Sequence, residues 1–223
     1  MAHGSRGVDM EVLQQISESL QRGEDKKVAE LTRQAIDDGL AAGQILNQGL
    51  LAGMDVVSAR FGANEIFLPE VLLAARAMNA GMDLIKPLLI AGEVRSLGKV
   101  VIGTVKGDLH DIGKNLVGVM LKGAGFEVID LGANVAPERF VETAETEGAQ
   151  VVGLSALLTT TMSGMKDVVD LLKGKGLEGR VKVIVGGAPL SQAFADAIGA
   201  DGYGYDASNA VTLVKRLTGV AAP

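Results

Sequence analysis

The sequence predicts an all-α four-helix domain followed by an α/β domain with a flavodoxin-like (Rossmann-like) five-stranded parallel sheet. Two observations predict this division. Over residues 10–91 the apolar residues recur at helical spacing, whereas over residues 99–218 short β-branched runs alternate with helical segments. The Gly-containing stretch at 92–98 separates the two patterns and is expected to be a linker. Residues 1–9 are expected to form a flexible N-terminus and residues 219–223 a short tail.

Four helices are expected in the first domain. The most regular apolar stripe covers residues 71–89, where apolar side chains recur at steps of four and three. Three earlier stripes begin at Leu13, Val28 and Leu46. Pro69 is placed at the start of the fourth helix, because the N–H that proline lacks has no partner at that position.

Five parallel strands are expected in the second domain, each followed by a helix. The strands are 100–105, 127–131, 151–155, 181–185 and 202–205, and the helices are 112–122, 137–147, 162–173, 191–198 and 207–217. Five such units with right-handed crossovers favour the strand order 2-1-3-4-5, whose switch point lies between strands 1 and 3. We therefore expect a ligand to meet the loops that follow these two strands.

The composition excludes several classes of chemistry. The 223 residues contain no Cys, which rules out disulfides, cysteine-ligated zinc, iron–sulfur clusters and thiol nucleophiles. The net charge of -6 disfavours a nucleic-acid partner. No apolar run approaches the roughly 20 residues of a membrane span, and no signal-peptide pattern is present, so no membrane partner and a cytoplasmic location are expected.

The chain has 2 histidines, His3 near the N-terminus and His110 in the Gly-containing loop 106–113 after the first strand. Asp108 precedes His110 by two residues, near enough to bond one imidazole nitrogen and orient the other toward a metal. The alternative is an ordinary helix start, with Asp108 or Asp111 as the cap and His110 as a solvated turn residue. The metal-ligand interpretation gains weight because the one internal histidine lies at the predicted switch point.

Small and hydroxyl-bearing residues follow the other strands. The loop 155–161 carries four hydroxyls, which could bond a buried polar ligand or cap the next helix. Gly186 and Gly187 leave space over the sheet edge after the fourth strand. The segment 203–208 could line a pocket or cap the last helix.

Three common α/β sites do not match these loops. A phosphoacceptor receiver needs an aspartate at the end of the third strand, where this chain has Ser155. A dinucleotide site needs G-x-G-x-x-G after the first strand, and the glycines here are spaced differently. A flavin site needs aromatic rings, yet aromatic residues make up 3% of the chain.

Three short motifs stand at the strand ends: D-x-H-x-x-G at 108–113, S-x-L at 155–157 and paired glycines at 186–187. Together they resemble the cobalamin-binding domain of cobalamin-dependent methionine synthase and of the small corrinoid proteins of methyltransferase systems. Residues 60–85 resemble the helical cap of the same family. The resemblance covers about residues 10–218, nearly the whole chain.

This resemblance implies a cobalamin site. His110 would be the lower axial ligand of cobalt, in place of the cofactor's own dimethylbenzimidazole, and Asp108 and Thr161 would complete a ligand relay. The implied cofactor-binding residues of the second domain are Gly107, Asp108, Leu109, His110, Asp111, Gly113, Ser155, Leu157, Thr159, Gly186, Gly187 and Ala207. Those of the cap, over the upper face of the corrin, are Phe61, Leu68 and Val71. For these three the alternative is core packing of the helices.

The resemblance also implies a function. The chain would bind cobalamin base-off/His-on and carry a methyl group from a substrate-specific corrinoid methyltransferase to a second methyltransferase that acts on tetrahydrofolate or a thiol such as coenzyme M. A reductive activase is a further expected partner, and catalysis would require these partners. We expect no room for homocysteine, folate or reactivation modules in 223 residues. The alternatives are a cobalamin-binding sensor or regulator and the small subunit of an adenosylcobalamin mutase.

Overall fold

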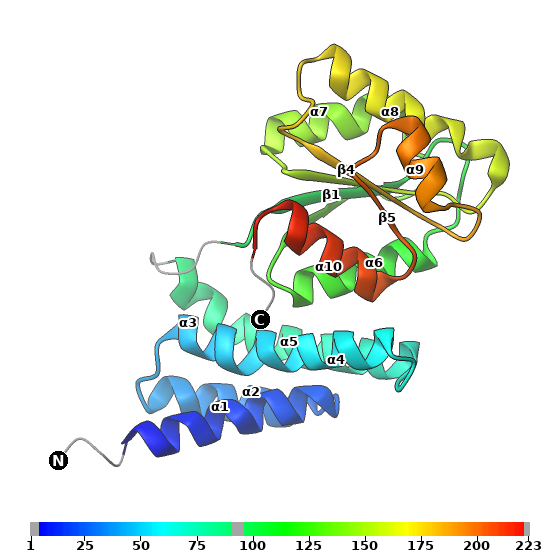
Figure 1. Ribbon diagram of the computed structural model, residues 1–223. Coiled ribbons are helices and arrows are strands. Elements are labelled where there is room, and N and C mark those ends of the chain that lie inside the picture. The colour runs from blue at the N-terminus through cyan, green and yellow to red at the C-terminus, as the bar shows by residue number, and fades with distance from the viewer. Residues whose placement is uncertain (1–4, 91–95, 221–223) are drawn as a thin grey trace. The chain divides into compact units, whose positions relative to one another are not determined.

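The computed structural model describes residues 5–90 and 96–220 and divides the chain into two compact units, Met1–Arg95 and Ser96–Pro223 (Figure 1). The expected flexible N-terminus, linker and tail each lie partly outside the described residues. Among the helices that the structure describes, none has both the length and the hydropathy needed to cross a bilayer.

Over its described residues, 5–90, the first unit consists of four helical segments, as the apolar spacing predicts. Three of them are single helices, α1 (Ser5–Gln21), α2 (Asp25–Asp37) and α5 (Leu68–Ile90). The other runs without interruption through α3 (Ala42–Gln44), the π-helical η1 (Ile45–Leu51) and α4 (Ala52–Gly62). Their apolar stripes form a common core, whose fully buried members include Ile16, Leu20, Val28, Leu50, Val57 and Ile85.

Two details of this unit differ from the sequence expectation. Helix α1 begins at Ser5, whereas the sequence predicts a flexible stretch as far as residue 9, because no apolar period marks the first turn. The π-helical segment η1 is also unexpected. Apolar residues at steps of four, such as Leu46, Leu50 and Met54, fit an α-helix and a π-helical insertion equally well, so the pattern does not separate them.

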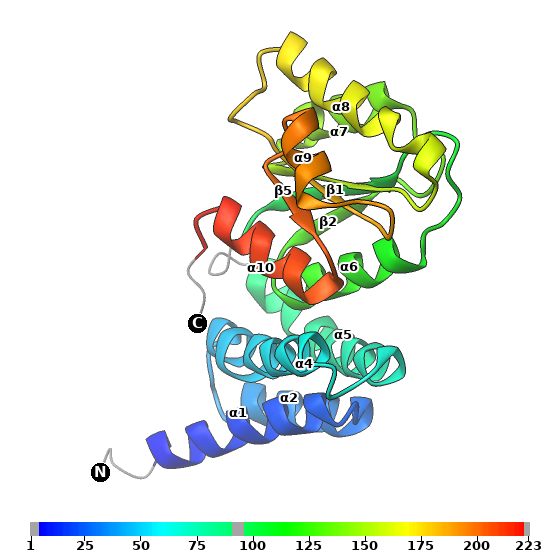
Figure 2. The ribbon, with the colours of Figure 1, turned by 45° about the vertical axis from the view of Figure 1, so that its right-hand side comes forward.

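The second unit contains a five-stranded parallel sheet in the predicted order β2-β1-β3-β4-β5. The strands are β1 (Lys99–Thr104), β2 (Glu127–Asp130), β3 (Val151–Ser155), β4 (Lys182–Gly186) and β5 (Gly202–Gly204). Helices α6 (Ile112–Gly123) and α10 (Ala207–Leu217) cover one face, and α7 (Pro137–Glu147), α8 (Ser163–Gly174) and α9 (Gln192–Ile198) cover the other (Figures 1 and 2). The predicted strand and helix boundaries of this unit all lie within one residue of these.

Both faces of the sheet are buried, because helices cover both. On one face Val101 and Val152 pack in the same core as Phe140 of α7 and Val168 of α8. On the other, Ile102 lies against the position of Gly118 in α6, where a Cβ would come within 2.8 Å of its side chain. Two-sided burial explains why β1 has a continuous apolar run in place of alternation.

Small residues line up across the carboxyl edge of the sheet. Thr104 pairs in register with Ser155, Ser155 with Gly186, and Gly186 with Gly204. A Cβ at Gly204 would lie 3.1 Å from the Cβ of Ala210 in α10, so this row faces the side covered by α6 and α10. The end of the sheet on that side therefore carries little side-chain bulk.

Candidate functional site

The loop between β1 and α6 places Asp108 inside the protein and His110 at its surface. Gly107 turns the chain at φ +84°, a conformation that L side chains rarely adopt. Asp108 is fully buried, whereas 52% of the His110 side chain is exposed. Thr104, at the end of β1, is also fully buried and donates from Oγ1 to the carbonyl of His110 over 3.0 Å.

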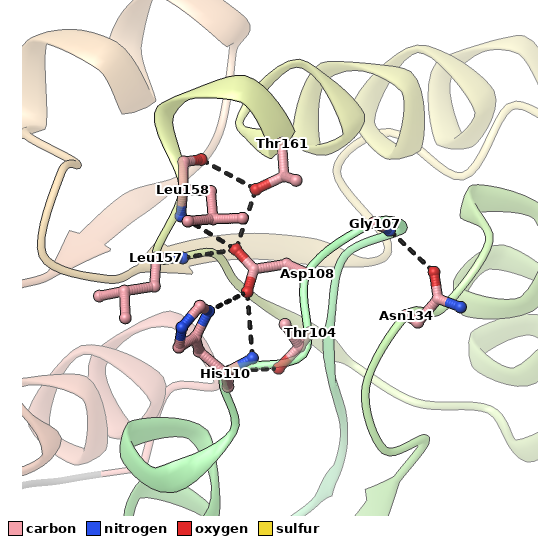
Figure 3. Close-up of polar contacts among 8 residues, drawn as sticks. All are labelled: Thr104, Gly107, Asp108, His110, Asn134, Leu157, Leu158 and Thr161. Atoms are coloured by element: carbon pink, nitrogen blue, oxygen red, sulfur yellow. Dashed lines mark hydrogen bonds and ion pairs between the residues drawn. The ribbon is translucent and has the colours of Figure 1, made fainter.

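The carboxylate of Asp108 is the centre of a hydrogen-bond network (Figure 3). Its Oδ1 accepts from the backbone N–H of His110 at 3.0 Å and contacts the ring Nδ1 of His110 at 2.7 Å. Its Oδ2 accepts from the backbone N–H groups of Leu157 and Leu158, at 2.8 and 3.0 Å, and from the Thr161 hydroxyl at 2.9 Å. One side chain thus joins the loops that follow β1 and β3.

These contacts set the charge of Asp108. Burial alone would raise the pKa of the carboxyl, because it disfavours the charged form. The backbone N–H groups of His110, Leu158 and Leu157, and then the imidazole, act in the opposite direction and prevail, so the pKa lies well below its usual range. Asp108 is therefore ionised at neutral pH and can only accept hydrogen bonds.

The ionised carboxylate in turn sets the tautomer of His110. Nδ1 must carry the proton that it donates to Oδ1 of Asp108. In the neutral ring, Nε2 then has the free lone pair, and it makes no hydrogen bond with any residue that the structure describes. A carboxylate-oriented imidazole with a free nitrogen is the arrangement of metal-ligating histidines.

Thr161 closes the network on the side of β3. It is the last residue of the 3-10 turn η2 (Thr159–Thr161), and its Oγ1 lies 2.9 Å from Oδ2 of Asp108 and 2.8 Å from the carbonyl oxygen of Leu158. A hydroxyl has one hydrogen, so Thr161 donates to one of these two acceptors at a time. The structure therefore brings together Asp108, His110 and Thr161, which the sequence assigns to one relay.

The loops after β1 and β3 do not fit the helix-capping alternative. Asp111 occupies the N-cap position of α6, but its side chain makes no capping hydrogen bond. Met162 precedes α8, and no hydroxyl caps that helix. The segment before α10 is different, because Asp206 accepts from the N–H of Asn209 at 2.7 Å and is a true cap. There the capping interpretation holds.

Among the other predicted residues of this unit, Gly113 provides space and Ser155 and Thr159 provide free hydroxyls, whereas Gly187 allows two loops to approach closely. A Cβ at Gly113 would meet nothing within 4 Å, whereas one at Gly187, whose φ is +138°, would lie 1.8 Å from the carbonyl oxygen of Ala156. The side chains of Ser155 and Thr159 make no hydrogen bond within the described part of the chain. Two hydroxyls therefore remain available to a ligand.

The remaining predicted residues lie at helix ends or in the first unit. Ala207 is the buried first residue of α10. Phe61 lies near the end of α4 and Leu68 at the start of α5, and both are partly exposed. Val71 is fully buried, which suits core packing, the alternative for this residue.

Apolar side chains gather at the carboxyl ends of the strands. Five large ones are exposed there, with exposed fractions from 41% to 76%: Leu109, Ile112, Leu157, Leu158 and Tyr205. They come from the loops after β1, β3 and β5 and from the first turn of α6. Carboxyl ends of parallel strands share one edge of the sheet, and exposed apolar side chains at such an edge are typical of a ligand site.

Sequence reasoning misses two polar residues that hold the His110 loop, Thr104 and Asn134. Asn134 accepts at Oδ1 from the N–H of Gly107 over 2.8 Å. Only weak signals in the sequence point to these two residues. Thr104 ends an apolar strand, and Asn134 follows Gly132 by two residues in a turn, where asparagine tolerates a left-handed backbone. Ile112 and Leu158 are missed as well, since exposed apolar residues in loops and at helix starts look like core residues in a sequence.

Comparison with known proteins gives two matches to family models. A B12 binding domain model matches residues 98–212, and a second B12 binding domain model matches residues 12–86. The chain is 46% identical over 208 residues to dimethylamine corrinoid protein 2 of Methanosarcina acetivorans, covering 93% of this chain and 96% of that protein. It is 42% identical over 213 residues to a corrinoid protein of Desulfitobacterium hafniense, covering 94% and 99%.

A solved structure gives the same result. The methanol:cobalamin methyltransferase complex MtaBC of Methanosarcina barkeri contains a chain that matches with a TM-score of 0.85 at 31% identity, covering 95% of this chain and 81% of that one. The predicted fold class and the predicted cobalamin cofactor are confirmed by these matches. The chain belongs to the family of B12-binding corrinoid proteins of methyltransferase systems.

Proposed function

We propose that this chain binds cobalamin base-off/His-on, with Nε2 of His110 as the lower axial ligand of cobalt. The observation that carries the proposal is the 2.7 Å contact between Nδ1 of His110 and the buried, ionised Asp108. This contact fixes the tautomer in which Nε2 has a free lone pair, on a side chain that is half-exposed at the sheet edge. The chemistry of this donor fits a metal that needs a single ligand from the protein.

The surrounding residues fit a large, partly apolar ligand with a polar tail. Leu109 and Leu157 present exposed apolar side chains beside His110, where we propose that the corrin ring lies. The residues proposed to border the loop or leave room for the nucleotide tail are Gly107, Asp111, Gly113, Gly186, Gly187 and Ala207. Ser155 and Thr159, whose hydroxyls have no partner among the described residues, would bond that tail.

Asp108 and Thr161 would adjust the hold of His110 on the metal. Asp108 keeps the proton on Nδ1 and so leaves the lone pair on Nε2, and the Thr161 hydroxyl can turn between Asp108 and the carbonyl of Leu158. In the first unit we propose, from the family resemblance, that Phe61 and Leu68 contact the corrin's upper face and that Val71 lies close by. Among these three, the full burial of Val71 makes it the least suited to direct contact.

We further propose that the chain carries a methyl group between two methyltransferases. The bound cobalt would supply the atom that accepts and releases the methyl group. The donor side would be a substrate-specific corrinoid methyltransferase, and the acceptor side a methyltransferase acting on tetrahydrofolate or a thiol such as coenzyme M, with a reductive activase as a third partner. Support comes from the dimethylamine corrinoid protein at 46% identity and from the methanol:cobalamin methyltransferase complex.

Methyl uptake tests this role. Reduced, cobalamin-loaded protein is incubated with pairs of donor and methyltransferase for methanol, methylamines, betaine and methoxylated aromatics, and methylation is followed by absorbance and mass. We expect one pair to load about one methyl group per cobalamin, because a single metal-bound site carries it. His3→Ala is the matched control and should load normally. If none of the pairs loads a methyl group and the adenosylcobalamin-loaded protein assembles in a light-dependent way, the methyl-carrier role is wrong and the protein is a cobalamin-binding sensor.

A further inference from the structure

The segment between β2 and α7 contacts the His110 loop directly. Asn134 in this segment has φ +56°, and its side chain and backbone both reach the loop. Its Oδ1 accepts from the N–H of Gly107 at 2.8 Å (Figure 3). Its own N–H donates to the carbonyl of Asp108 at 3.0 Å. The following residue, Val135, donates from its N–H to the carbonyl of Thr104 at 3.0 Å. These hydrogen bonds hold the turn before His110 at Thr104, Gly107 and Asp108.

The end of β2, directly before this segment, holds the start of α6 at the far end of the loop. The side chain of Lys114, only 3% exposed, places Nζ 2.6 and 2.5 Å from the two carboxylate oxygens of Asp130, the last residue of β2. Asp130 Oδ1 in turn accepts from the N–H of Gly132 at 2.9 Å. The residues from Gly107 to Lys114 are therefore bonded at both ends to residues 130–134.

We infer that Asn134 is a positioning residue for the axial ligand, an inference that rests on the proposed role of His110. Glycine has more backbone freedom than any other residue type. A loop that turns at Gly107 therefore keeps one conformation only if other contacts fix that turn. Asn134 fixes the N–H of Gly107 and the carbonyl of Asp108, and thereby the direction of the Asp108 side chain. It acts through Asp108, because among the described residues it makes no hydrogen bond to His110.

The position of Asn134 allows a clean test, because the side chain is exposed and its backbone is left-handed. In Asn134→Gly the φ of +56° is retained without strain and only the amide is removed. In Asn134→Asp a carboxylate oxygen can still accept from Gly107, so this variant serves as the rescue control. Neither change creates a buried cavity, so we expect both variants to fold, with a loss of stability in Asn134→Gly no larger than that of one hydrogen bond.

Three measurements test the effect of Asn134 on Gly107, on His110 and on the cobalt ligand in turn. In the cofactor-free protein, amide hydrogen exchange at Gly107 should be about fivefold faster in Asn134→Gly, as expected for one lost hydrogen bond. Exchange at Val105, whose N–H donates to Ser155, is the internal reference. The population of His110 with its proton on Nδ1, read from ¹⁵N NMR, should fall. In cobalamin-loaded Co(II) protein, the fraction with histidine nitrogen coupling should fall as well, and Asn134→Asp should restore all three.

Each outcome separates this inference from the proposed function. Faster exchange at Gly107 with an unchanged His110 tautomer and unchanged nitrogen coupling would show that Asn134 only stabilises a turn, and would overturn the inference. Absence of nitrogen coupling in the wild-type protein would overturn the proposed role of His110. In that case the exchange and tautomer data on the cofactor-free protein would still decide whether Asn134 positions the Asp108–His110 pair.

Discussion

Replacing Asp108 with alanine is expected to lower the free energy of unfolding by about 2–4 kcal/mol, because its backbone donors lose a buried acceptor. The carboxylate accepts hydrogen bonds from the N–H groups of His110, Leu157 and Leu158. Without it, these three donors cannot all be hydrogen-bonded in the folded loop. The same change removes the group that fixes the proton on Nδ1 of His110. Urea unfolding measures the first effect, and ¹⁵N NMR of the imidazole measures the second.

Asp108→Asn separates stability from ligand orientation. Asparagine has the same size, but its amide accepts through one oxygen and donates through nitrogen. If the oxygen stays on Leu157 and Leu158, the NH₂ faces Nδ1 and His110 must carry its proton on Nε2, where it cannot bind a metal. We therefore expect a smaller loss of stability than in the alanine variant but an equal loss of axial coordination. Wild-type coordination in Asp108→Asn would show that Asp108 does not set the tautomer.

The low pKa of Asp108 also predicts a pH dependence. Burial would raise this pKa, but the hydrogen bonds to the charged form outweigh it and hold the pKa well below its usual range. The carboxylate therefore stabilises the fold fully above the unfolded-state pKa of about 3.9, and this stability is lost as the pH falls toward the folded-state pKa. Below about pH 4, wild-type stability should fall more steeply than that of Asp108→Asn, by up to about 1.4 kcal/mol per pH unit. Parallel curves would contradict the assignment.

Gly187→Ala is the second change with a large expected effect. At φ +138° an alanine is strained, and its Cβ would lie 1.8 Å from the backbone oxygen of Ala156. Since a backbone oxygen cannot turn aside as a flexible side chain does, the loops after β3 and β4 must separate. We expect a loss of about 3 kcal/mol or more in the free energy of unfolding, measured by urea denaturation.

Gly113→Ala is the matched control for this prediction. A Cβ at Gly113 meets nothing within 4 Å, and alanine favours the first turn of α6, so this variant should be as stable as the wild type or up to about 1 kcal/mol more stable. Its added methyl group lies where we propose the nucleotide tail, so cobalamin should bind more weakly. Equal stability of the two variants, or full cobalamin affinity in Gly113→Ala, would contradict the distinct roles given to these glycines.

The order of the elements could be predicted from the sequence because each carries its own signal. Helical apolar spacing marked α5, and short apolar runs that contain adjacent valines marked β1 and β3, whose two faces are both buried. The π-helical η1 could not be predicted, because its apolar residues keep the spacing of an ordinary helix. The start of α1 at Ser5 could not be predicted either, because no apolar period marks that turn.

The site was predictable where a residue type is rare and not where it is common. One internal histidine with an aspartate two residues before it identified the pair that the structure joins at 2.7 Å. Asn134 was not predictable, because its partner Gly107 is 27 residues away and only the sheet order brings them together. The N–H groups of Leu157 and Leu158 were not predictable, since backbone donors leave no mark in a sequence.

The proposal that His110 holds the metal is tested most directly by electron paramagnetic resonance of the Co(II) state. The protein is produced with ¹⁵N-labelled histidine and loaded with unlabelled cobalamin. If Nε2 of His110 is the axial ligand, the nitrogen splitting changes from a triplet to a doublet and disappears in His110→Ala, whereas His3→Ala keeps the doublet. A triplet that persists in the labelled protein would come from the cofactor's own dimethylbenzimidazole and would contradict His110 as the ligand.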